Sequence, residues 1–332
     1  MTIPILILYP HSRCNCRCLM CDIWKETTAR EIGIAELERH LDDMEKLSVE
    51  WVVLSGGEPL MHSDLFRFCR LLRERRIRTT ILSTGLLLER HATQIVESVD
   101  EVIVSLDGPA PVHDRIRRVH GGFALLARGV AAILHRDAHF SIATRSTVQR
   151  ENFLHLRETA AAAQTLGLRW ISYLAADLTS TAFNRPERWS PGRQSQIALS
   201  ETEVPLLEDE IEALISEWGP SGFVREDAAK LRRIALHYKA HLGLCEAVAP
   251  RCNAPWVSAV IEADGTVRPC FFHEPIGRMN GGGLLEVLSG PQAAAFRSGL
   301  NVAENPTCRR CVCSLHYVAP DGEGEAPHRR HR

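Results

Sequence analysis

Short apolar runs alternate with amphipathic segments through the first half of the chain. Runs such as ILILY (5–9) have the length and composition of buried strands, and the segments between the runs repeat their apolar residues with helical period. Strands are predicted at 5–9, 51–55, 78–84, 101–108, 140–148 and 168–175, with helices at 32–47, 65–75, 123–136 and 151–167. This alternation predicts a parallel sheet with right-handed crossovers. An open doubly wound sheet and a barrel, complete or partial, both agree with the order.

The pattern changes after the sixth predicted strand. Residues 178–200 are polar and contain prolines, which predicts a surface loop, and helical period returns at 203–218 and 225–243. From residue 245 onward the chain is rich in Cys, Gly and Pro, with a short strand within 256–265 that turns at Asp264-Gly265. The polar end of the chain, 322–332, is predicted to be disordered.

Charge and cysteine content narrow the functional class. Among 332 residues, 39 Lys and Arg stand against 41 Asp and Glu, so no global basic field points to a nucleic-acid partner. The N-terminus lacks a signal-peptide pattern, and no apolar run reaches the roughly 18 residues of a membrane span. We therefore expect a cytoplasmic protein without a membrane partner. In a reducing compartment, 11 cysteines favour metal binding over disulfides.

Four of these cysteines lie in PHSRCNCRCLMCDIWK (10–25), where Cys14, Cys18 and Cys21 form the pattern C-x3-C-x2-C. Zinc usually takes four ligands, whereas three thiolates can hold three irons of a [4Fe–4S] cluster and leave the fourth iron open. The loop follows the first predicted strand, at the C-terminal mouth where α/β barrels place their sites. With these residues the chain resembles the radical S-adenosylmethionine (radical SAM) superfamily. The extra thiol of Cys16 is interpreted as a bystander.

The stretch SGGEP (55–59) closes the second predicted strand and strengthens the resemblance. In the superfamily this segment contacts the amino group of the methionine part of S-adenosylmethionine (SAM). The resemblance therefore implies that Gly56, Gly57, Glu58 and Pro59 bind SAM. Backbone carbonyls and the nearby Glu58 would accept hydrogen bonds from the ammonium group.

Single positions further along the chain also match the family pattern. The resemblance implies that Ser105 binds the ribose or carboxylate of SAM and that Arg145 pairs with that carboxylate in a bidentate way. Met20 stands where relatives often have an aromatic residue that packs on adenine, and its thioether can fill that space. Asp107 is a candidate polar group facing the cavity. Ser83-Thr84-Gly85 replaces the Thr-Asn-Gly of many relatives, so no role is transferred there.

The rear cysteines resemble the twitch domain, a shortened relative of the SPASM iron–sulfur domain. The resemblance implies one auxiliary [4Fe–4S] cluster held by Cys252, Cys270, Cys308 and Cys311. Cys245 or Cys313 is an alternative to one of these four. A structural zinc site with four cysteine ligands stays open as another interpretation. Cys69, inside a helical run, is expected to be a small buried apolar residue.

The resemblance implies a partial (β/α)6 TIM-like barrel with a small C-terminal cysteine-rich domain. We expect the barrel at 1–200, bridging helices at 201–244, the auxiliary-cluster domain at 245–320 and a disordered tail at 321–332. The implied chemistry is reductive cleavage of SAM to a 5′-deoxyadenosyl radical, which removes hydrogen from a substrate with net oxidation or rearrangement. The implied electron donor is a protein of the flavodoxin or ferredoxin type.

The substrate class rests on weaker signs. The chain starts at the first strand without a fused peptide-recognition domain, so a small-molecule substrate is favoured over a peptide. No general acid or base stands out, and Asp107, Tyr173 and His273 are the only candidates. Two other classes stay open: a non-catalytic iron–sulfur electron carrier, and a zinc-stabilised α/β binding protein.

Overall fold

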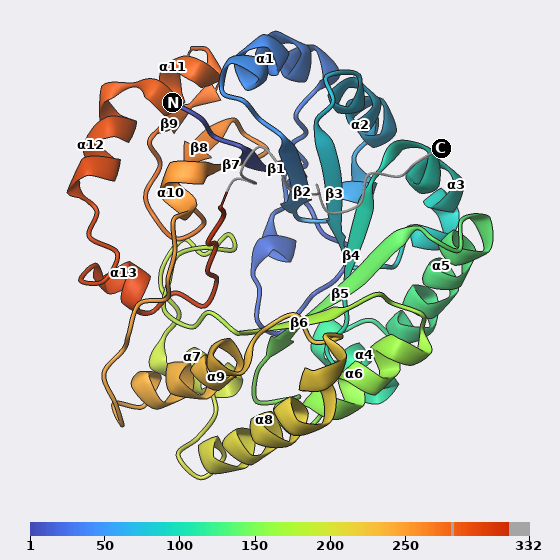
Figure 1. The fold of residues 1–332 in the computed structure, drawn as a ribbon, viewed down its shortest axis with the longest axis vertical. Helices are drawn as coiled ribbons and strands as arrows, with labels where there is room; N and C mark the ends of the chain where they lie inside the picture. The colour runs from blue at the N-terminus through green and yellow to red at the C-terminus, as the bar shows by residue number, and fades with distance from the viewer. Residues whose placement is uncertain (280–281, 319–332) are drawn as a thin grey trace.

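One curved sheet of nine strands organises the protein, whose computed structural model describes residues 1–279 and 282–318. The strand order is β6-β5-β4-β3-β2-β1-β7-β8-β9. Strands β1 to β6 are parallel and lie in chain order, so the chain moves one strand along the sheet after each crossover (Figure 1). β6 and β9 stand at opposite ends of the order, so the barrel stays open. The expected α/β class with a partial barrel is confirmed.

The six predicted strands are all present, with ends that differ from the prediction by a few residues. The strands are β1 (Ile5–His11), β2 (Trp51–Gly56), β3 (Arg78–Ser83), β4 (Glu101–Ser105), β5 (Ser141–Val148) and β6 (Ile171–Ala175). The helices between them are α1 (Ile34–Lys46), α2 (Leu65–Glu74), α3 (Leu88–Ser98), α4 (Ala110–Arg117), α5 (Gly122–Arg136) and α6 (Leu156–Thr165). Short 3-10 turns follow β1 and β2, at η1 (Ile23–Lys25) and η2 (Pro59–Met61). Helices α3 and α4 had not been predicted.

The two faces of the parallel strands have different neighbours. Successive side chains of a strand point to opposite faces. Leu6 and Val52 are fully buried on the face that the helices cover. Ile7 and Val53 line a hollow on the inner, concave face. Because both faces are apolar, the strands read as continuous apolar runs rather than as an alternating pattern.

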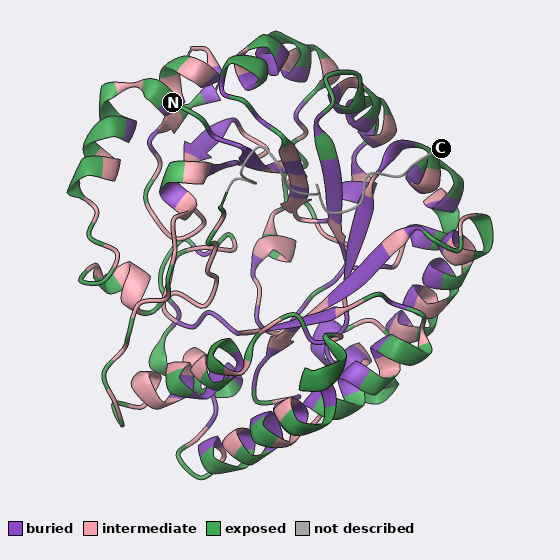
Figure 2. Cartoon of the chain, in the orientation of Figure 1, coloured by how far each residue is buried: buried purple, intermediate pink, exposed green. Residues whose placement is uncertain are grey.

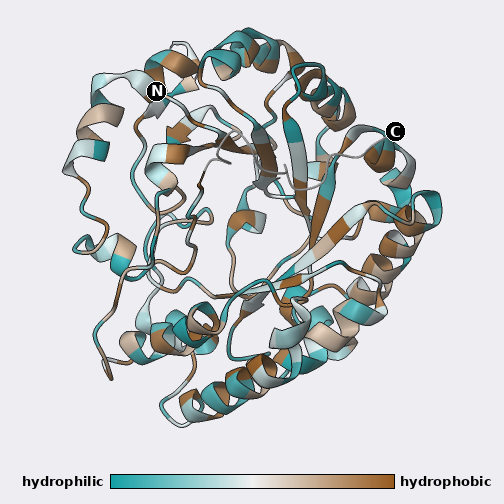
Figure 3. Ribbon diagram, viewed as in Figure 1, coloured by the Kyte–Doolittle hydropathy of each residue, from teal (hydrophilic) through white to brown (hydrophobic). Residues whose placement is uncertain are grey.

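The crossover helices cover the convex face of the sheet. In α2 the buried side chains are Leu65, Phe68, Cys69 and Leu72, which recur with helical period. Figure 2 shows buried residues on the strands and on the helix surfaces that face them, with exposed residues on the outer helix surfaces. Figure 3 shows hydrophobic residues along the strands, with hydrophilic positions on β3 and β5. The expectation that Cys69 is a buried apolar residue is confirmed.

The rear part of the chain continues the same sheet. After α8 (Val204–Trp218), η3 (Gly219–Ser221) and α9 (Ala228–His241), the chain returns to place β7 (Ser258–Ile261) parallel to β1, with Ser258 opposite Ile5. β8 (Thr266–Arg268) and β9 (Gly277–Arg278) add antiparallel pairs. The predicted turn at Asp264-Gly265 is present, and its glycine has a positive φ of 84°. Because β7 belongs to the same sheet as β1, the predicted domain boundary at residue 245 remains a proposal.

Short helices complete the described chain. They are α7 (Pro191–Ile197), α10 (Ala254–Val257), α11 (Leu284–Ser289), α12 (Pro291–Gly299) and α13 (Pro306–Arg309). The predicted tail at 321–332 lies outside the described residues. Within the part of the chain that the structure describes, every helix is too short or too polar to cross a bilayer.

The prediction of a surface loop or linker at 178–200 is correct for most of the segment, but it misses a short helix and several buried side chains. The segment contains α7, and Arg185 and Trp189 are only 3% and 8% exposed. These two side chains turn inward, onto the loop that carries the front cysteines. Their buried contacts are made with residues far away in the chain, which the local polar composition could not reveal.

Candidate functional site

The front cysteine loop follows β1 at the C-terminal edge of the parallel strands. Cys14, Cys18 and Cys21 all line one hollow of about 250 Å³. Gly56 and Gly57, at the end of β2, line the same hollow. Because β1 and β2 are parallel neighbours, the segments that leave their carboxyl ends meet at one edge of the sheet. The structure thus brings the two sequence motifs together.

Close backbone contacts hold this loop against its neighbours. The amide of Leu19 donates to the carbonyl of Ile116 at 3.0 Å, and the amide of Glu58 donates to the carbonyl of Arg13 at 2.9 Å. A Cβ atom at Gly57 would lie 2.0 Å from the Arg13 carbonyl oxygen. Glycine at this position is therefore required for the approach of the two loops, as well as leaving the hollow open.

Cys18 is the most enclosed of the three motif cysteines. Its Sγ accepts a hydrogen bond from Nη1 of Arg117 at 3.5 Å. Cys16 lines the same hollow and is buried. A hydrogen bond from the Cys16 thiol lowers the pKa of Cys18, and the positive charge of Arg117 lowers it further. Cys16, interpreted from the sequence as a bystander, is therefore a direct neighbour of a motif cysteine.

Asp107 does not face the cavity as expected. Its carboxylate is fully buried, forms an ion pair with Nη2 of Arg117 at 2.6 Å, and accepts a hydrogen bond from the Thr147 amide at 2.9 Å. Arg117 lines the hollow in its place. The negative charge of Asp107 raises the pKa of Cys18, opposite in direction to the effect of Arg117. Tyr173, another candidate acid or base, is buried in the core with its hydroxyl donating to the Leu156 carbonyl at 2.7 Å.

The expectation that the Glu58 carboxylate meets the ammonium of SAM needs correction. Neither Glu58 nor Pro59 is among the described residues that line the hollow, and both are buried. Glu58 instead accepts hydrogen bonds from the amide of Thr84 at 2.7 Å, from its hydroxyl at 2.6 Å, and from the hydroxyl of Ser83 at 3.0 Å. Burial raises the pKa of Glu58. The side chain ties the end of β2 to the end of β3, and Ser83 and Thr84 gain a role that the sequence had not assigned.

The other predicted SAM contacts lie in the front hollow. Met20, Ser105 and Arg145 all line it. Ser105 is the register partner of Arg145 across β4 and β5. Nε of Arg145 donates to the Ser172 hydroxyl at 3.0 Å, which fixes the guanidinium over the end of the sheet. Their contacts with SAM stay predictions, but all three share a cavity with the motif cysteines.

Residues 177–193, which we call the Arg185 segment, hold the front loop on both sides of Cys21. Arg185 forms a buried ion pair with Asp177 at 2.5 Å and donates to the carbonyl of Met20 at 3.3 Å. Nε1 of Trp189 donates to the carboxylate of Asp22 at 2.7 Å. Met20 and Asp22 flank Cys21 in the sequence. The segment therefore positions the third motif cysteine.

A second hollow, of about 210 Å³, is lined by five of the six rear cysteines: Cys252, Cys270, Cys308, Cys311 and Cys313. Cys245 lies apart, lining a different hollow, with its Sγ 3.8 Å from the carbonyl oxygen of Leu236. Of the two alternative ligands, the structure thus groups Cys313 with the predicted four and leaves Cys245 outside. Nε2 of His273 lies 3.4 Å from Sγ of Cys308, at the wall of this second hollow.

The front and rear hollows adjoin. Six residues line both of them: Leu82, Ile103, Arg145, Phe271, Phe272 and Cys313. The shared wall is thus mainly apolar and contains one positive charge. The front cysteines line one hollow, four of the rear cysteines line the other, and Cys313 lines both.

The donor chemistry fits iron–sulfur clusters. Burial raises the pKa of Cys21 and of Cys270 to about 12, so these thiols keep their protons until a cationic metal group displaces them. Among residues 1–279 and 282–318, no three His, Cys, Asp or Glu side chains converge as one metal ion would require. A [4Fe–4S] cluster distributes its thiolate ligands over separate irons, and each hollow is lined by at least three cysteines.

Comparison with known families decides the assignment. The model of the radical SAM superfamily matches residues 8–163, from β1 to α6, and that of the iron–sulfur cluster-binding SPASM domain matches residues 252–312. The chain belongs to the radical SAM superfamily. The first match contains the front cysteines and the SGGEP segment, and the second contains Cys252, Cys270, Cys308 and Cys311. The cofactors of this radical SAM enzyme are a SAM-binding [4Fe–4S] cluster, an auxiliary iron–sulfur cluster and SAM.

The curated relatives described here match less than half of this chain. The AdoMet-dependent heme synthase of Oleidesulfovibrio alaskensis is 28% identical over 159 residues, which cover 46% of this chain and 40% of the relative. The pre-heme d1 synthase of Dinoroseobacter shibae is 29% identical over 160 residues, covering 47% of this chain and 39% of the relative. The match spans about two fifths of the length of either relative.

Solved structures share the fold over almost the whole radical SAM chain. Streptococcus suis SuiB bound to SAM superposes with a TM-score of 0.63 at 14% identity, covering 95% of this chain and 73% of SuiB. The enzyme anSMEcpe with bound AdoMet and Cp18Cys peptide gives a TM-score of 0.62 at 18% identity, covering 88% and 81%. At these identities the likeness establishes the fold alone.

Sequence reasoning missed several residues of the site in this radical SAM protein. Phe271 and Phe272 could have been predicted to lie near the rear cysteines, because they directly follow Cys270 in the sequence. Arg117 lies in the stretch after SLDGP that resembles the family, but nothing local distinguished it from the neighbouring arginines. Arg185 and Trp189 had no signal in their polar segment.

Proposed function

We propose that this radical SAM enzyme cleaves SAM reductively and removes a hydrogen atom from a small-molecule substrate held between its two cysteine sets. The observation that carries the proposal is the joined pair of hollows with thiols lining both. When bound, the front cluster and SAM supply a 5′-deoxyadenosyl radical, which can attack an unactivated C–H bond. The auxiliary cluster suits a net oxidation, although a rearrangement uses the same hydrogen abstraction.

The chain's own residues would bind and orient the reactants. Cys14, Cys18 and Cys21 would hold the SAM-binding cluster, and Cys252, Cys270, Cys308 and Cys311 the auxiliary one. The backbone of Gly56 and Gly57 would accept the ammonium group of SAM, since their side-chain-free surface faces the hollow. Arg145 would pair with the SAM carboxylate and Ser105 would contact the same end of the molecule. Met20 would pack against adenine.

Phe271 and Phe272 would exclude water from the space between the cysteine sets. Their rings lie 6.3 Å apart, and the ring of Phe271 lies 6.1 Å from that of Tyr9. An apolar wall protects a reactive radical from side reactions with solvent. The protein would work in a reducing cytoplasmic compartment, which agrees with 11 unbridged cysteines.

The names of the curated relatives support a small-molecule substrate. Several of them are named for small-molecule products, as heme synthases, a pre-heme d1 synthase and probable GTP 3′,8-cyclases. A peptide is the second candidate, because solved structures of the same fold are described with the precursor peptide SuiA and with a Cp18Cys peptide.

The test follows hydrogen from substrate to product. The protein is purified without oxygen, its clusters are rebuilt, and SAM and dithionite are added. Extract from host cells grown in deuterated medium is split by ultrafiltration into small-molecule and peptide-sized fractions. The mass of the 5′-deoxyadenosine formed is then measured with each fraction.

Deuterium gained only with the small-molecule fraction is the expected result. Gain only with the larger fraction would replace the small molecule by a peptide. A protein with full iron content that forms no 5′-deoxyadenosine at all would refute the SAM chemistry. That result would instead favour a non-catalytic iron–sulfur electron carrier.

A further inference from the structure

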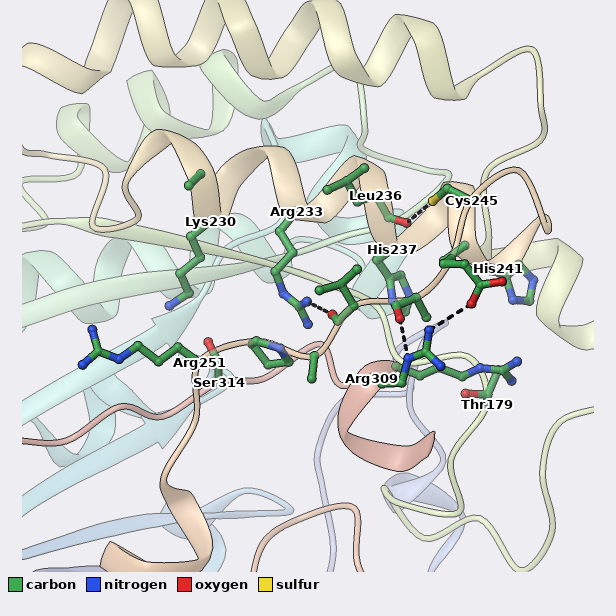
Figure 4. Close-up of a pocket in the computed structure, with 18 of the residues that line it drawn as sticks. Thr179, Lys230, Arg233, Leu236, His237, His241, Cys245, Arg251, Arg309 and Ser314 are labelled. Carbon is green, nitrogen blue, oxygen red and sulfur yellow. Dashed lines mark hydrogen bonds and ion pairs between the residues drawn. The ribbon is translucent and has the colours of Figure 1, made fainter. Parts of the chain in front are cut away.

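A third hollow, of about 690 Å³, opens on the outer side of the rear cysteine set. It lies between helix α9, the loop at 245–251 and the segment at 309–316 (Figure 4). Pro250 and Ser314 line both this hollow and the one that holds the rear cysteines. The three hollows therefore form a series that runs from the front cysteines, past the rear cysteines, to the surface.

The outer hollow has an excess of positive charge. Its lining includes five Lys or Arg side chains and two Asp or Glu side chains: Lys230, Arg233, Arg251, Arg309, Arg310, Asp227 and Glu246. Both carboxylates are already engaged, since Asp227 caps α9 and Glu246 pairs with Arg309 at 2.9 Å. Among the described side chains, none of Arg233, Arg251 and Arg310 pairs with a carboxylate. We therefore expect the hollow to attract a negatively charged partner.

Exposed apolar side chains surround the same opening. Leu236 and Val248 line the hollow and are 48% and 69% exposed, and Leu244, next to Cys245, is 53% exposed. Large apolar side chains gathered at one exposed place mark a protein contact more often than a small-ion site. Charges around an apolar centre are the usual arrangement of a protein–protein interface.

The hollow lies directly against the chain that carries the rear thiols. Arg233 donates a hydrogen bond to the carbonyl of Cys311, and Figure 4 shows its guanidinium directed from α9 toward the opposite wall. Arg309 and Arg310 separate Cys308 from Cys311, and Ser314 follows Cys313. A partner seated in the hollow would thus contact the backbone next to three of the rear cysteines.

We propose that this basic hollow docks an acidic one-electron carrier protein of the flavodoxin or ferredoxin class. The inference rests on the proposed function, because the carrier would exchange its electron with the auxiliary cluster there. One electron leaves the reduced carrier and enters the protein at the rear cysteine set. The carrier is oxidised by one electron, the protein is reduced by one, and no covalent bond forms or breaks. Transient redox complexes use small contacts, so a charged hollow with an apolar rim is sufficient.

The first test measures binding. A purified acidic flavodoxin is titrated into the cluster-loaded protein by calorimetry at low and at high ionic strength. We expect binding that weakens as salt rises, because the attraction is electrostatic. The double variant Arg251→Glu with Arg310→Glu should bind about tenfold or more weakly, since like charges then face each other. The control Arg90→Glu with Arg169→Glu changes the net charge equally at exposed sites that line none of the three hollows, and should bind normally.

The second test measures electron transfer. The absorbance of the clusters is followed in a stopped-flow instrument after mixing with reduced flavodoxin or with dithionite. We expect the Arg251/Arg310 variant to be slowed with flavodoxin while dithionite, which needs no docking, reduces all the proteins alike. The milder Lys230→Gln variant, with an exposed side chain, should show a smaller slowing in the same direction.

Three results would overturn the proposal. The first is flavodoxin binding that does not change with salt concentration. The second is equal slowing of electron transfer in the control variant. The third is a charge-reversal variant that no longer binds an acidic peptide but is still reduced by flavodoxin at the normal rate. The last result would assign the hollow to a peptide. If dithionite drives SAM cleavage normally in these cases, the proposed function stands although the docking site fails. If dithionite drives no SAM cleavage with full iron content, the function itself fails.

Discussion

The guanidinium of Arg185 lies over the indole of Trp189, with its central carbon 3.6 Å from the ring centroid. This pair is the centre of the Arg185 segment, which holds the residues on both sides of Cys21. The planar, delocalised charge of arginine suits such stacking, and lysine would not reproduce it. The buried pair therefore couples a distant segment to the geometry of the front cysteine loop.

Removing Arg185 should loosen the front loop. Arg185→Met leaves the carboxylate of Asp177 buried without its partner, which typically costs about 3–5 kcal/mol of unfolding free energy. We expect a lower denaturation midpoint and incomplete iron loading at the front site. Adding Asp177→Asn should restore much of the stability, because no uncompensated charge then remains. If the double variant is no more stable than Arg185→Met, the buried ion pair is not the cause.

Arg117 and Asp107 should shift the reduction potential of the front cluster in opposite directions. Arg117→Gln removes a positive charge and a hydrogen bond to Sγ of Cys18, so the potential should fall. Asp107→Asn keeps the arginine but removes the carboxylate that offsets its charge, so the potential should rise. A redox titration followed by electron paramagnetic resonance measures both. Shifts of the same sign would show that the variants act by disturbing the loop rather than by charge.

The iron content of single-cysteine variants should separate Cys245 from the other rear cysteines. Cys245 lines the outer hollow, away from the five thiols that share the rear hollow. Cys245→Ala should therefore keep the full iron and sulfide content, whereas Cys252→Ala should lose the auxiliary cluster. Both are compared in a background with Cys14, Cys18 and Cys21 changed to Ala, which isolates the rear site. Loss of iron in Cys245→Ala would make it a ligand after all.

A side chain at Gly57 should destabilise the site. The Cβ atom of Gly57→Ala would lie 2.0 Å from the Arg13 carbonyl oxygen, so the two loops must separate. Overpacking of this kind costs about 1–3 kcal/mol. Gly33→Ala is the matched control, because nothing lies within 4 Å of its Cβ atom. Urea denaturation should show a clear loss for the first variant and little change for the second.

His113 should contribute to acid sensitivity. Burial, together with the nearby positive charge of Arg117, lowers the pKa of His113 to about 3. The unfolded chain takes up a proton near the ordinary pKa of about 6.5, whereas the folded one stays neutral. Stability from His113 is therefore present above pH 6.5 and decreases, by about 1.4 kcal/mol per pH unit, as pH falls toward 3.

His113→Asn keeps an acceptor for the Asp107 amide, which donates to Nδ1 of the histidine at 3.3 Å. Between pH 6 and 4, the free energy of unfolding of this variant should depend on pH less steeply, by the amount that the uptake of one proton contributes. Urea denaturation of both proteins across this range measures the difference, and contributions from other groups cancel. An unchanged slope would mean that His113 can protonate in the folded protein.

Local patterns were sufficient for the barrel and for the front motif. The apolar runs that became β1 to β6 are buried on both faces, and this burial makes them recognisable as strands. The cysteine motif after β1 and the SGGEP stretch after β2 lie at one edge because adjacent parallel strands end there. Two elements with weaker patterns, α3 and α4, escaped prediction, as did the burial of Arg185 and Trp189.

What the amino-acid sequence by itself determined was which elements form and which residue types can bind iron and SAM, because strand burial, helical period and thiol spacing are short-range properties. The tertiary structure decided the rest. It placed β7 beside β1, turned Glu58 toward Ser83 and Thr84, put Cys313 between the two hollows, and brought Trp189 to Asp22 across 167 residues of chain. Each of these four placements depends on contacts between segments far apart in the sequence. Such contacts form only when the sheet has assembled and curved.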